Sequence, residues 1–236
     1  MEFRINSLFV CFSFALVLSP SLLVSPVTDG ELNQYLEFIA FAQTSSNLTL
    51  SSLISEGSPY YGNITSPLVV IDFSDFQCYL CKRYVDNTEQ QLNSTYVQPG
   101  KAIYVFKHLP NRGFDSKTIS LAAQCTNDQD KFWEYHNMLY ANQGPIDSGW
   151  GSVKNLKKFA SQLRDFNITQ FNACFDANKY GLFVNRDISL ANSLGFTETP
   201  SFIVMKSDGS IIEKIQGPKP FPIFKAVIEN LERKIK

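Results

Sequence analysis

Residues 68–82 of this chain read LVVIDFSDFQCYLCK and place an apolar run directly before two cysteines. The run from residue 68 to 73 is rich in β-branched side chains, which is typical of a buried strand. Cys78 and Cys81 follow it, and helical periodicity then continues to about Tyr96. We therefore expect both cysteines in the first turn of a helix that follows a strand, and this arrangement decides the fold.

Cys78 is placed where a thiolate is stabilised. At a helix N-terminus, a sulfur faces unpaired backbone N–H groups and the positive end of the helix dipole. Its pKa can therefore fall well below the free-thiol value of about 8.5, which makes it a nucleophile and a good leaving group. Cys81, one turn further on, can reach back and resolve a mixed disulfide, and Lys82 and Arg83 add positive charge nearby. The pattern predicts a redox-active pair.

Other uses of the pair stay open at this point. Half of a zinc site would need two more ligands, but there is no second closely spaced cysteine pair, and His108 and His136 are distant in sequence. A purely structural disulfide would gain little from closing so short a loop. The thiols could also capture a soft ion such as Cu(I) for delivery, or belong to a redox-silent binding module. We expect redox chemistry, with no metal site and no cofactor.

The rest of the chain predicts an α/β fold. A second strand at about 102–106 after the helix implies a parallel strand–helix–strand unit. The stretch from 116 to 194 has helical periodicity, and Asp208-Gly209 between two β runs is a strong hairpin signal. An amphipathic helix over residues 221–235 closes the chain. The predicted order is strand, helix, strand, a helical block, a hairpin and a helix.

The N-terminal residues indicate export. Residues 8–18 form an almost unbroken apolar run, which has the length of a signal-peptide core and is too short to cross a bilayer comfortably. We expect a signal peptide or an uncleaved anchor at 1–26 and a polar tether at 27–54. Asn-x-Ser/Thr sequons permit glycosylation. Loss of Cys11 with a signal would leave four cysteines, an even number that suits two disulfides outside the cytosol.

The composition excludes two classes of protein. Hydrophobic residues make up 44% of the 236 residues and aromatic residues 14%, which is enough for a sizeable core and unlike a disordered chain. The net charge is −1 and the charged residues are scattered, so no basic surface for nucleic acid is indicated. We expect one folded domain with an insertion, or two small domains, and no nucleic-acid partner.

Three separate segments resemble the DsbA-like thioredoxin family, the disulfide oxidoreductases of bacteria and archaea. They are residues 57–82, which end in FQCYLCK, residues 130–136, DKFWEYH, and residues 195–202, GFTETPSF. The resemblance runs from about residue 55 to the C-terminus. It implies an α/β, thioredoxin-like fold with an inserted helical domain. The thioredoxin-like domain would comprise residues 55–113 and 193–236, and the helical insert residues 114–192.

The resemblance also implies roles for single residues. Cys78 would be the exposed attacking cysteine and Cys81 the buried resolving one. Thr199-Pro200 would be a cis peptide against the disulfide, where it helps to present backbone to a substrate; a trans proline that begins a strand is the alternative. Asp72 would be a buried acid that relays a proton for Cys81, the alternative being an ordinary carboxylate at a strand end.

The two remaining cysteines, Cys125 and Cys174, lie in separate helical segments, 49 residues apart. Paired, they would form a structural disulfide that stabilises the insert by about 4 kcal/mol in the chain-entropy model. Two buried free thiols are the alternative.

The function that the resemblance implies is that of an extracytoplasmic thiol–disulfide oxidoreductase, which introduces disulfides into exported proteins with free thiols. A membrane reoxidase of the quinone-linked or VKOR type would regenerate it. Many members of the family have proline or histidine between the cysteines, whereas this chain has Tyr79 and Leu80. That departure argues against a very oxidising potential. It keeps open a disulfide isomerase or reductase, beside a copper- or zinc-binding chaperone that uses the same thiols.

Overall fold

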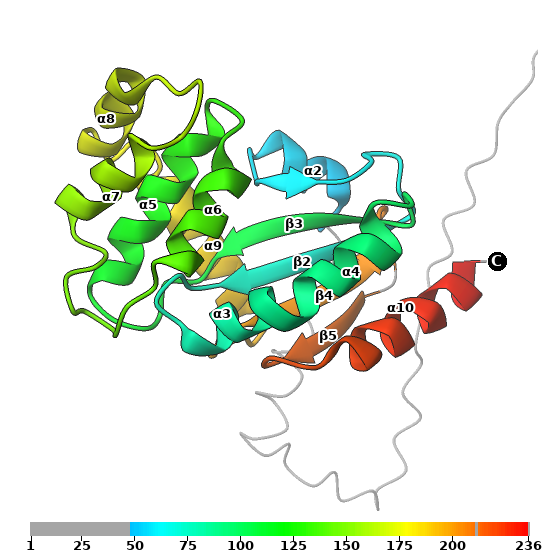
Figure 1. Cartoon of the computed structure of the whole chain (residues 1–236). Helices are drawn as coiled ribbons and strands as arrows, with labels where there is room; N and C mark the ends of the chain where they lie inside the picture. Colours follow the sequence, from blue (N-terminus) through cyan, green and yellow to red (C-terminus); the bar gives the residue numbers. More distant parts are fainter. Residues whose placement is uncertain (1–47, 211, 236) are drawn as a thin grey trace, which may run out of the picture.

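The computed structural model describes residues 48–210 and 212–235, and its centre is a mixed sheet with the strand order β1-β3-β2-β4-β5 (Figure 1). Strands β2 and β3 run parallel, and the other neighbouring pairs are antiparallel. The strands are β1 (Tyr60–Tyr61), β2 (Leu68–Ser74), β3 (Ala102–His108), β4 (Ser201–Lys206) and β5 (Ile212–Gln216). The predicted α/β class, parallel strand–helix–strand unit and C-terminal hairpin are confirmed.

Helices cover both faces of this sheet and one end of it (Figure 1). The connection from β2 to β3 is a long helix, α3 (Tyr79–Tyr84) and α4 (Gln90–Leu92), with π-helical turns at Val85–Glu89 and Asn93–Val97. The other helices are α2 (Leu50–Ser55), α5 (Asp115–Asn127), α6 (Phe132–Ala141), α7 (Val153–Ala160), α8 (Ile168–Asp176), α9 (Gly181–Ser193) and α10 (Phe221–Ile235).

The alternation of side chains along the central strands divides the core between the two faces. Every residue of β2 and β3 is buried, because helices cover both faces of these strands. On one face, Val70 packs with Tyr84 of α3 and Phe224 of α10. On the other face, Ile71 packs with Ala191 of α9. The long helix is therefore fixed against the sheet, and so is the position of its N-terminus at the end of β2.

Helices α5 to α8 form a layer at the end of the sheet toward which β2 and β3 point (Figure 1). A disulfide joins Cys125 on α5 to Cys174 on α8, so the pair is bonded rather than present as two free thiols. Helix α9 contacts both α5 and β3. The division into a thioredoxin-like domain and an insert at 114–192 stays a prediction, and α9 belongs to both layers.

The prediction of a tether at 27–54 is wrong for residues 48–54. Leu48, Leu50 and Leu53 are buried in the core, and the N-cap residue of α2 is Thr49, whose side chain forms a reciprocal capping box with Ser52. These leucines belong to a core cluster with residues of β2, β3 and β4, which are distant in sequence, so the serine-rich composition around them did not reveal their burial. The signal or anchor at 1–26 and the tether over 27–47 lie outside the described residues.

Among residues 48–210 and 212–235, no helix has the length and apolar character needed to cross a membrane.

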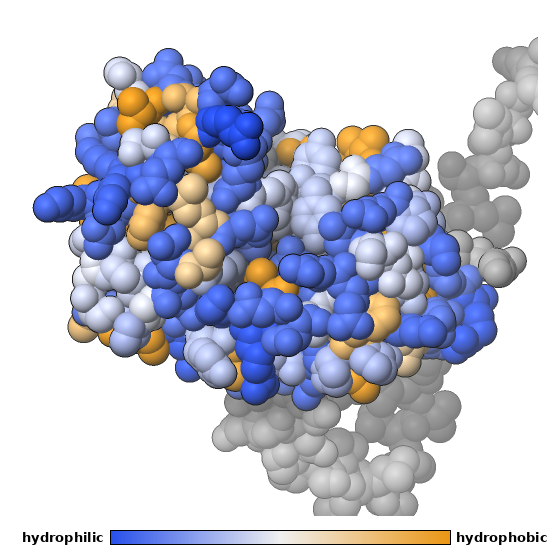
Figure 2. Space-filling model, viewed as in Figure 1, coloured by the Kyte–Doolittle hydropathy of each residue, from blue (hydrophilic) through white to orange (hydrophobic). Residues whose placement is uncertain are grey.

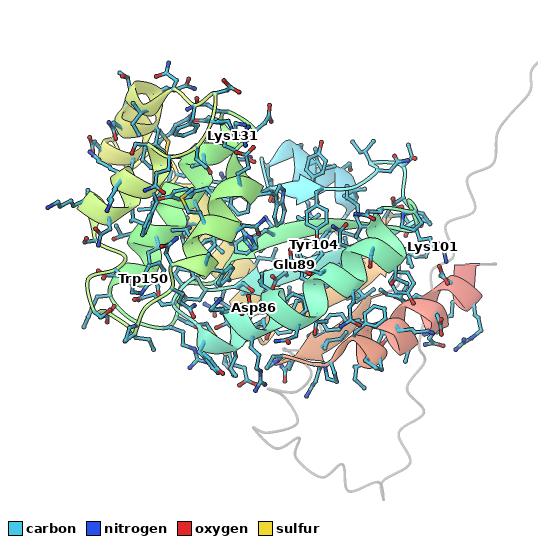
Figure 3. All side chains as sticks on the ribbon, viewed as in Figure 1. Asp86, Glu89, Lys101, Tyr104, Lys131 and Trp150 are labelled. Atoms are coloured by element: carbon cyan, nitrogen blue, oxygen red, sulfur yellow. A yellow bond between two sulfur atoms is a disulfide. The ribbon has the colours of Figure 1, made fainter. Side chains whose placement is uncertain are left out.

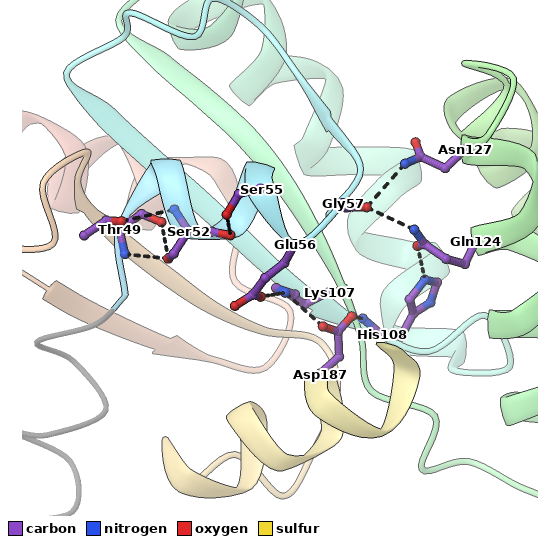
Figure 4. A network of polar contacts seen from close by, with 10 residues as sticks. All are labelled: Thr49, Ser52, Ser55, Glu56, Gly57, Lys107, His108, Gln124, Asn127 and Asp187. Carbon is purple, nitrogen blue, oxygen red and sulfur yellow. Dashed lines mark hydrogen bonds and ion pairs between the residues drawn. The ribbon is translucent and has the colours of Figure 1, made fainter. Parts of the chain in front are cut away.

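A buried ion pair joins three elements on one face of the sheet (Figure 4). The ammonium of Lys107 on β3 lies 2.9 Å from a carboxylate oxygen of Asp187 on α9 and 3.5 Å from one of Glu56, just after α2. The second oxygen of Asp187 accepts a hydrogen bond from the backbone N–H of His108. The side chains of Lys107 and Asp187 are 2% and 1% exposed, so this pair has almost no contact with water.

Candidate active site

Cys78 is the N-cap residue of α3, with an extended backbone at φ −78° and ψ 114°. Its carbonyl accepts hydrogen bonds from the backbone N–H groups of Cys81 and Lys82, both at 3.1 Å. The residue therefore lies where the first N–H groups of the helix point, because a buried strand and a short loop deliver the chain there.

The two thiols shift each other's pKa in opposite directions. Both cysteines are free thiols, and a hydrogen bond from the Cys81 thiol is the largest cause that lowers the pKa of Cys78 to about 6. Burial acts in the opposite direction, and the side chain of Thr199 and the backbone N–H groups of Cys81 and Leu80 lower the pKa further. Burial and the negative charge of Cys78 hold the pKa of Cys81 well above its usual value. Near neutral pH, Cys78 is the thiolate and Cys81 the thiol.

The family resemblance implied an exposed Cys78, but the structure buries this residue. Only 2% of its surface is accessible, and it belongs to the apolar cluster of the helical layer. Its sulfur lies 3.2 Å from the carbonyl oxygen of Thr199, and the side chain of Gln143, just after α6, donates to the carbonyl of Cys78. Because the residue is covered almost completely, we expect an incoming thiolate to displace one of its neighbours.

The peptide bond between Thr199 and Pro200 is cis. Thr199 is 1% exposed, and its hydroxyl donates to the side-chain oxygen of Asn111 at 3.2 Å. The amide of Asn111 in turn donates to the carbonyl of Thr197. The loop before β4 is thus attached to the loop after β3, and the cis peptide lies directly against Cys78.

Asp72 lies on the face of β2 that carries α3, and it is fully buried. Its carboxylate accepts hydrogen bonds from the hydroxyls of Ser74 at 2.6 Å and Tyr104 at 2.9 Å. Burial raises the pKa of Asp72 to about 7, against the effect of these two bonds. Its charge also contributes to the high pKa of Cys81. Asp72 can therefore gain or lose a proton near neutral pH, close to the thiol that must do the same.

A second buried acid, Asp75, was missed by the sequence analysis. Its carboxylate accepts hydrogen bonds from the backbone N–H groups of Gln77, Asn111 and Arg112. These bonds hold the loop before Cys78 against the loop after β3. The signal was present, because Asp75 stands three residues before the N-cap residue Cys78, and an aspartate that accepts a hydrogen bond from the backbone N–H two residues on is typical of an Asx turn.

The structure brings together Cys78, Cys81, Asp72 and the Thr199-Pro200 peptide, and it places the Cys125–Cys174 disulfide on helices of the other layer. Within the described part of the chain, no group of three or more His, Cys, Asp or Glu side chains could hold a metal ion.

We expect the reactivity of Cys78 to show its low pKa directly. The rate at which iodoacetamide alkylates the reduced protein should rise with a midpoint near pH 6, because only the thiolate reacts and the pKa of Cys78 is lowered to about 6. Stopped-flow alkylation with mass spectrometry would assign the modified sulfur. A midpoint near pH 8.5, the value of an unperturbed thiol, would refute the stabilised thiolate.

Comparison with known proteins identifies the family of this chain. The sequence model of the thioredoxin family matches residues 55–229. The chain is 22% identical to disulfide bond formation protein D of Bacillus subtilis over 186 residues. The matched segment covers 77% of this chain and 78% of that protein.

Two solved structures are similar in fold. The crystal structure of oxidised BdbD from Bacillus subtilis superimposes with a TM-score of 0.65 at 20% identity, over 74% of this chain and 92% of that one. The crystal structure of alpha-DsbA1 from Wolbachia pipientis gives 0.64 at 26% identity, over 75% and 92%. The predicted thioredoxin-like fold is confirmed.

Proposed function

Because the chain belongs to the thioredoxin family, we propose that it is a DsbA-like thiol–disulfide oxidoreductase with Cys78 and Cys81 as its redox pair. The observation that carries the proposal is the position of Cys78, which caps α3, receives a hydrogen bond from Cys81 and lies 3.2 Å from the Thr199 carbonyl. The relatives named for disulfide bond formation support the direction of the reaction, which introduces disulfides into exported proteins.

The reaction proceeds by two exchanges of sulfur. A substrate thiolate attacks the sulfur of Cys78 in the oxidised pair, the bond between Cys78 and Cys81 breaks, and Cys81 leaves as a thiolate that takes up a proton. A second substrate thiolate then attacks the substrate sulfur of the mixed disulfide and expels Cys78 as a thiolate. The substrate has lost two electrons and the pair has gained them. The second step is favoured because Cys78 is the more stable thiolate.

Asp72 supplies the proton in the first exchange. When Cys81 leaves, its thiolate is fully buried and would be strongly destabilised without a proton. Asp72 has a pKa of about 7, so near neutral pH it holds a proton in a substantial fraction of molecules. The same carboxylate can take that proton back when the pair is reoxidised. Its contribution is general acid–base catalysis, and it bears on Cys81 rather than on Cys78.

Asp72→Asn should separate this role from a structural one. Burial raises the pKa of Asp72 from 3.8 to about 7, so the folded chain keeps a proton that the unfolded chain loses between those values. Stability contributed by Asp72 is therefore lost as the pH rises to 7. We expect the variant to be about 4 kcal/mol more stable at pH 8 and unchanged near pH 4, and peptide oxidation to be about tenfold slower. Denaturant unfolding at several pH values measures this. The expectation is contradicted if the free energy of unfolding changes with pH in the same way in wild type and variant.

The potential of the pair decides the direction of the reaction. Titration of Cys78–Cys81 in glutathione buffers, followed by alkylation of the thiols, gives it directly. A value near −120 mV would mark a strong oxidant and one near −270 mV a reductant. Oxidation of a dithiol peptide by stoichiometric oxidised protein is the companion assay. If the protein cannot oxidise that peptide, the proposed function is wrong.

The proposal includes an extracytoplasmic site of action and a partner that regenerates the pair. Each new substrate disulfide leaves two electrons on Cys78 and Cys81, and these must pass to another acceptor. A membrane reoxidase of the quinone-linked or VKOR type fits this need. In cells that contain such a reoxidase, alkylation should find the pair mostly oxidised, and quinone depletion should shift it to dithiol. A pair that stays reduced in both conditions would exclude this partner.

A further inference from the structure

A groove opens beside the redox pair, between the long α3–α4 helix and α6. Figure 2 shows the surface hollowed there, between the helical layer and the sheet. Its volume is about 590 Å³. It is lined by Tyr61, Lys82, Val85, Asp86, Glu89, Gln90, Asn93, Trp133, Asn137, Tyr140 and Ala141. Lys82 directly follows Cys81, so the groove begins next to the redox pair and runs along the same helix.

Glu89 is an unusual lining residue because it is only 9% exposed. One of its carboxyl oxygens accepts a hydrogen bond from the Tyr61 hydroxyl at 3.5 Å, and the other is buried with no hydrogen-bond donor among the described residues. Burial, with the nearby charge of Asp72, raises the pKa of Glu89 to about 8. Near neutral pH this carboxyl group therefore holds a proton, and a cation brought against its unpaired oxygen would lower the pKa and favour the carboxylate. Figure 3 shows Glu89 and Asp86 on the long helix, beside Tyr104.

Three aromatic residues line the groove beside these polar side chains. The rings of Tyr61 and Trp133 meet edge to face, with centroids 4.6 Å apart, and Tyr140 is the third aromatic lining residue. Lys82, the one basic side chain among the described residues that line the groove, is already paired with Asp86 at 3.1 Å. Aromatic faces together with a carboxylate are the groups that bind ammonium and guanidinium ions. The charge and the shape of the groove therefore fit one more positive group.

We propose that this groove binds a lysine or arginine side chain of the polypeptide substrate while a substrate cysteine reacts at Cys78. This inference rests on the proposed function and names a substrate preference for it. Glu89 lies eleven residues after Cys78 on the helix, which corresponds to roughly 16 Å along its axis. An extended substrate covers that distance in about five residues. The preferred substrate thus carries its basic residue four or five positions from the reacting cysteine.

Matched dithiol peptides test the preference. One set carries lysine or arginine five positions before or after the reactive cysteine, and the other carries glutamine there. Stopped-flow oxidation by the oxidised full-length protein should be about five- to tenfold faster for the basic peptides than for the glutamine peptides, since a charged hydrogen bond and a cation–π contact are added. We expect this difference for only one of the two placements, before or after the cysteine. In Glu89→Gln the ratio should fall to about twofold or less. Glu213→Gln removes an exposed charge from β5, far from the groove, and should keep the full ratio.

The outcomes separate this inference from the proposed function. Equal rates for basic and neutral peptides overturn the groove assignment and leave the oxidoreductase intact. If neither peptide is oxidised, the function itself has failed. A preference that survives in folded Glu89→Gln also overturns the assignment.

A binding measurement covers the case in which Glu89→Gln does not fold. Peptides with serine in place of cysteine cannot react, and their binding to the oxidised protein can be followed by NMR. The lysine peptide should shift the indole N–H signal of Trp133, which lines the groove, and leave that of Trp150 in place. The glutamine peptide should shift neither. An unmoved Trp133 signal with the lysine peptide would count against the proposal.

Discussion

Cys78→Ser is expected to abolish disulfide transfer, with at least a thousandfold loss of the rate of peptide oxidation. The serine hydroxyl can neither form the disulfide with Cys81 nor accept a substrate sulfur, so no oxidising equivalent is stored. The stabilising contacts at this position, from Cys81 and the first N–H groups of α3, have a function only if the atom they surround becomes an anion. Oxidation of a fluorogenic dithiol peptide measures the loss.

Cys81→Ala should behave differently from Cys78→Ser. It keeps the thiolate at Cys78, which can attack a disulfide of an oxidised substrate, but removes the Cys81 thiol that would release the resulting adduct by attacking the Cys78 sulfur, so mixed disulfides with substrates should accumulate and be visible on non-reducing gels. Cys125→Ser/Cys174→Ser provides the cysteine control, because that pair is a disulfide on α5 and α8. Assayed below its lowered unfolding temperature, the double variant should keep its activity. If turnover survived in Cys78→Ser but was lost in Cys125→Ser/Cys174→Ser, the chemistry would belong to Cys125 and Cys174, and the assignment to Cys78 and Cys81 would be wrong.

The parts of the fold that the sequence predicted are those in which the local pattern and the final environment agree. The apolar run of β2 is buried on both faces in the structure, and the helix after it has its N-terminus where the cysteines are. The C-terminal helix occupies Phe221–Ile235, the range predicted from its amphipathic pattern. Each of these features depends on residues close in sequence. Periodicity and turn residues were therefore sufficient to find them.

The parts that the sequence did not predict depend on contacts between distant segments. Cys78 is buried because Thr199 and Gln143 lie against it, and they come from positions 121 and 65 residues further along the chain. Leu48, Leu50 and Leu53 stand in a serine-rich segment that is typical of a tether, yet they are buried in a cluster with residues of β2, β3 and β4. No local pattern reports such contacts, so the exposure of a side chain is harder to predict than its secondary structure.

The sequence contains a signal for the burial of Glu89. This residue falls on the stripe formed by Val85, Leu92 and Tyr96, at steps of four, three and four residues, which is the face that a helix turns to the core. A glutamate on that stripe conflicts with the usual exposure of charged residues. Such a local conflict often marks a site with a function.

Lys107→Met is expected to lower the free energy of unfolding by about 3–5 kcal/mol at pH 7. The substitution keeps most of the volume of the side chain and removes the ammonium that lies 2.9 Å from Asp187. The carboxylate of Asp187 is then left buried, and among the described residues only the backbone N–H of His108 still donates a hydrogen bond to it. Burial already raises the pKa of Asp187 to about 6, against the lowering effect of the Lys107 charge. Denaturant unfolding of both proteins measures the loss.

The pH dependence of that loss identifies its cause. Without Lys107 the pKa of Asp187 must rise further, so the folded variant holds a proton over a wider pH range than the unfolded chain does. The cost of the variant should then be small near pH 4, grow as the pH rises, and be complete above the new pKa of Asp187. Lys157→Met removes an ammonium from the exposed pair with Asp176 and should cost less than about 1 kcal/mol at every pH. A loss in Lys107→Met that stayed constant from pH 4 to 8 would mean that packing, and not the uncompensated charge of Asp187, sets the stability of this junction between β3, α2 and α9.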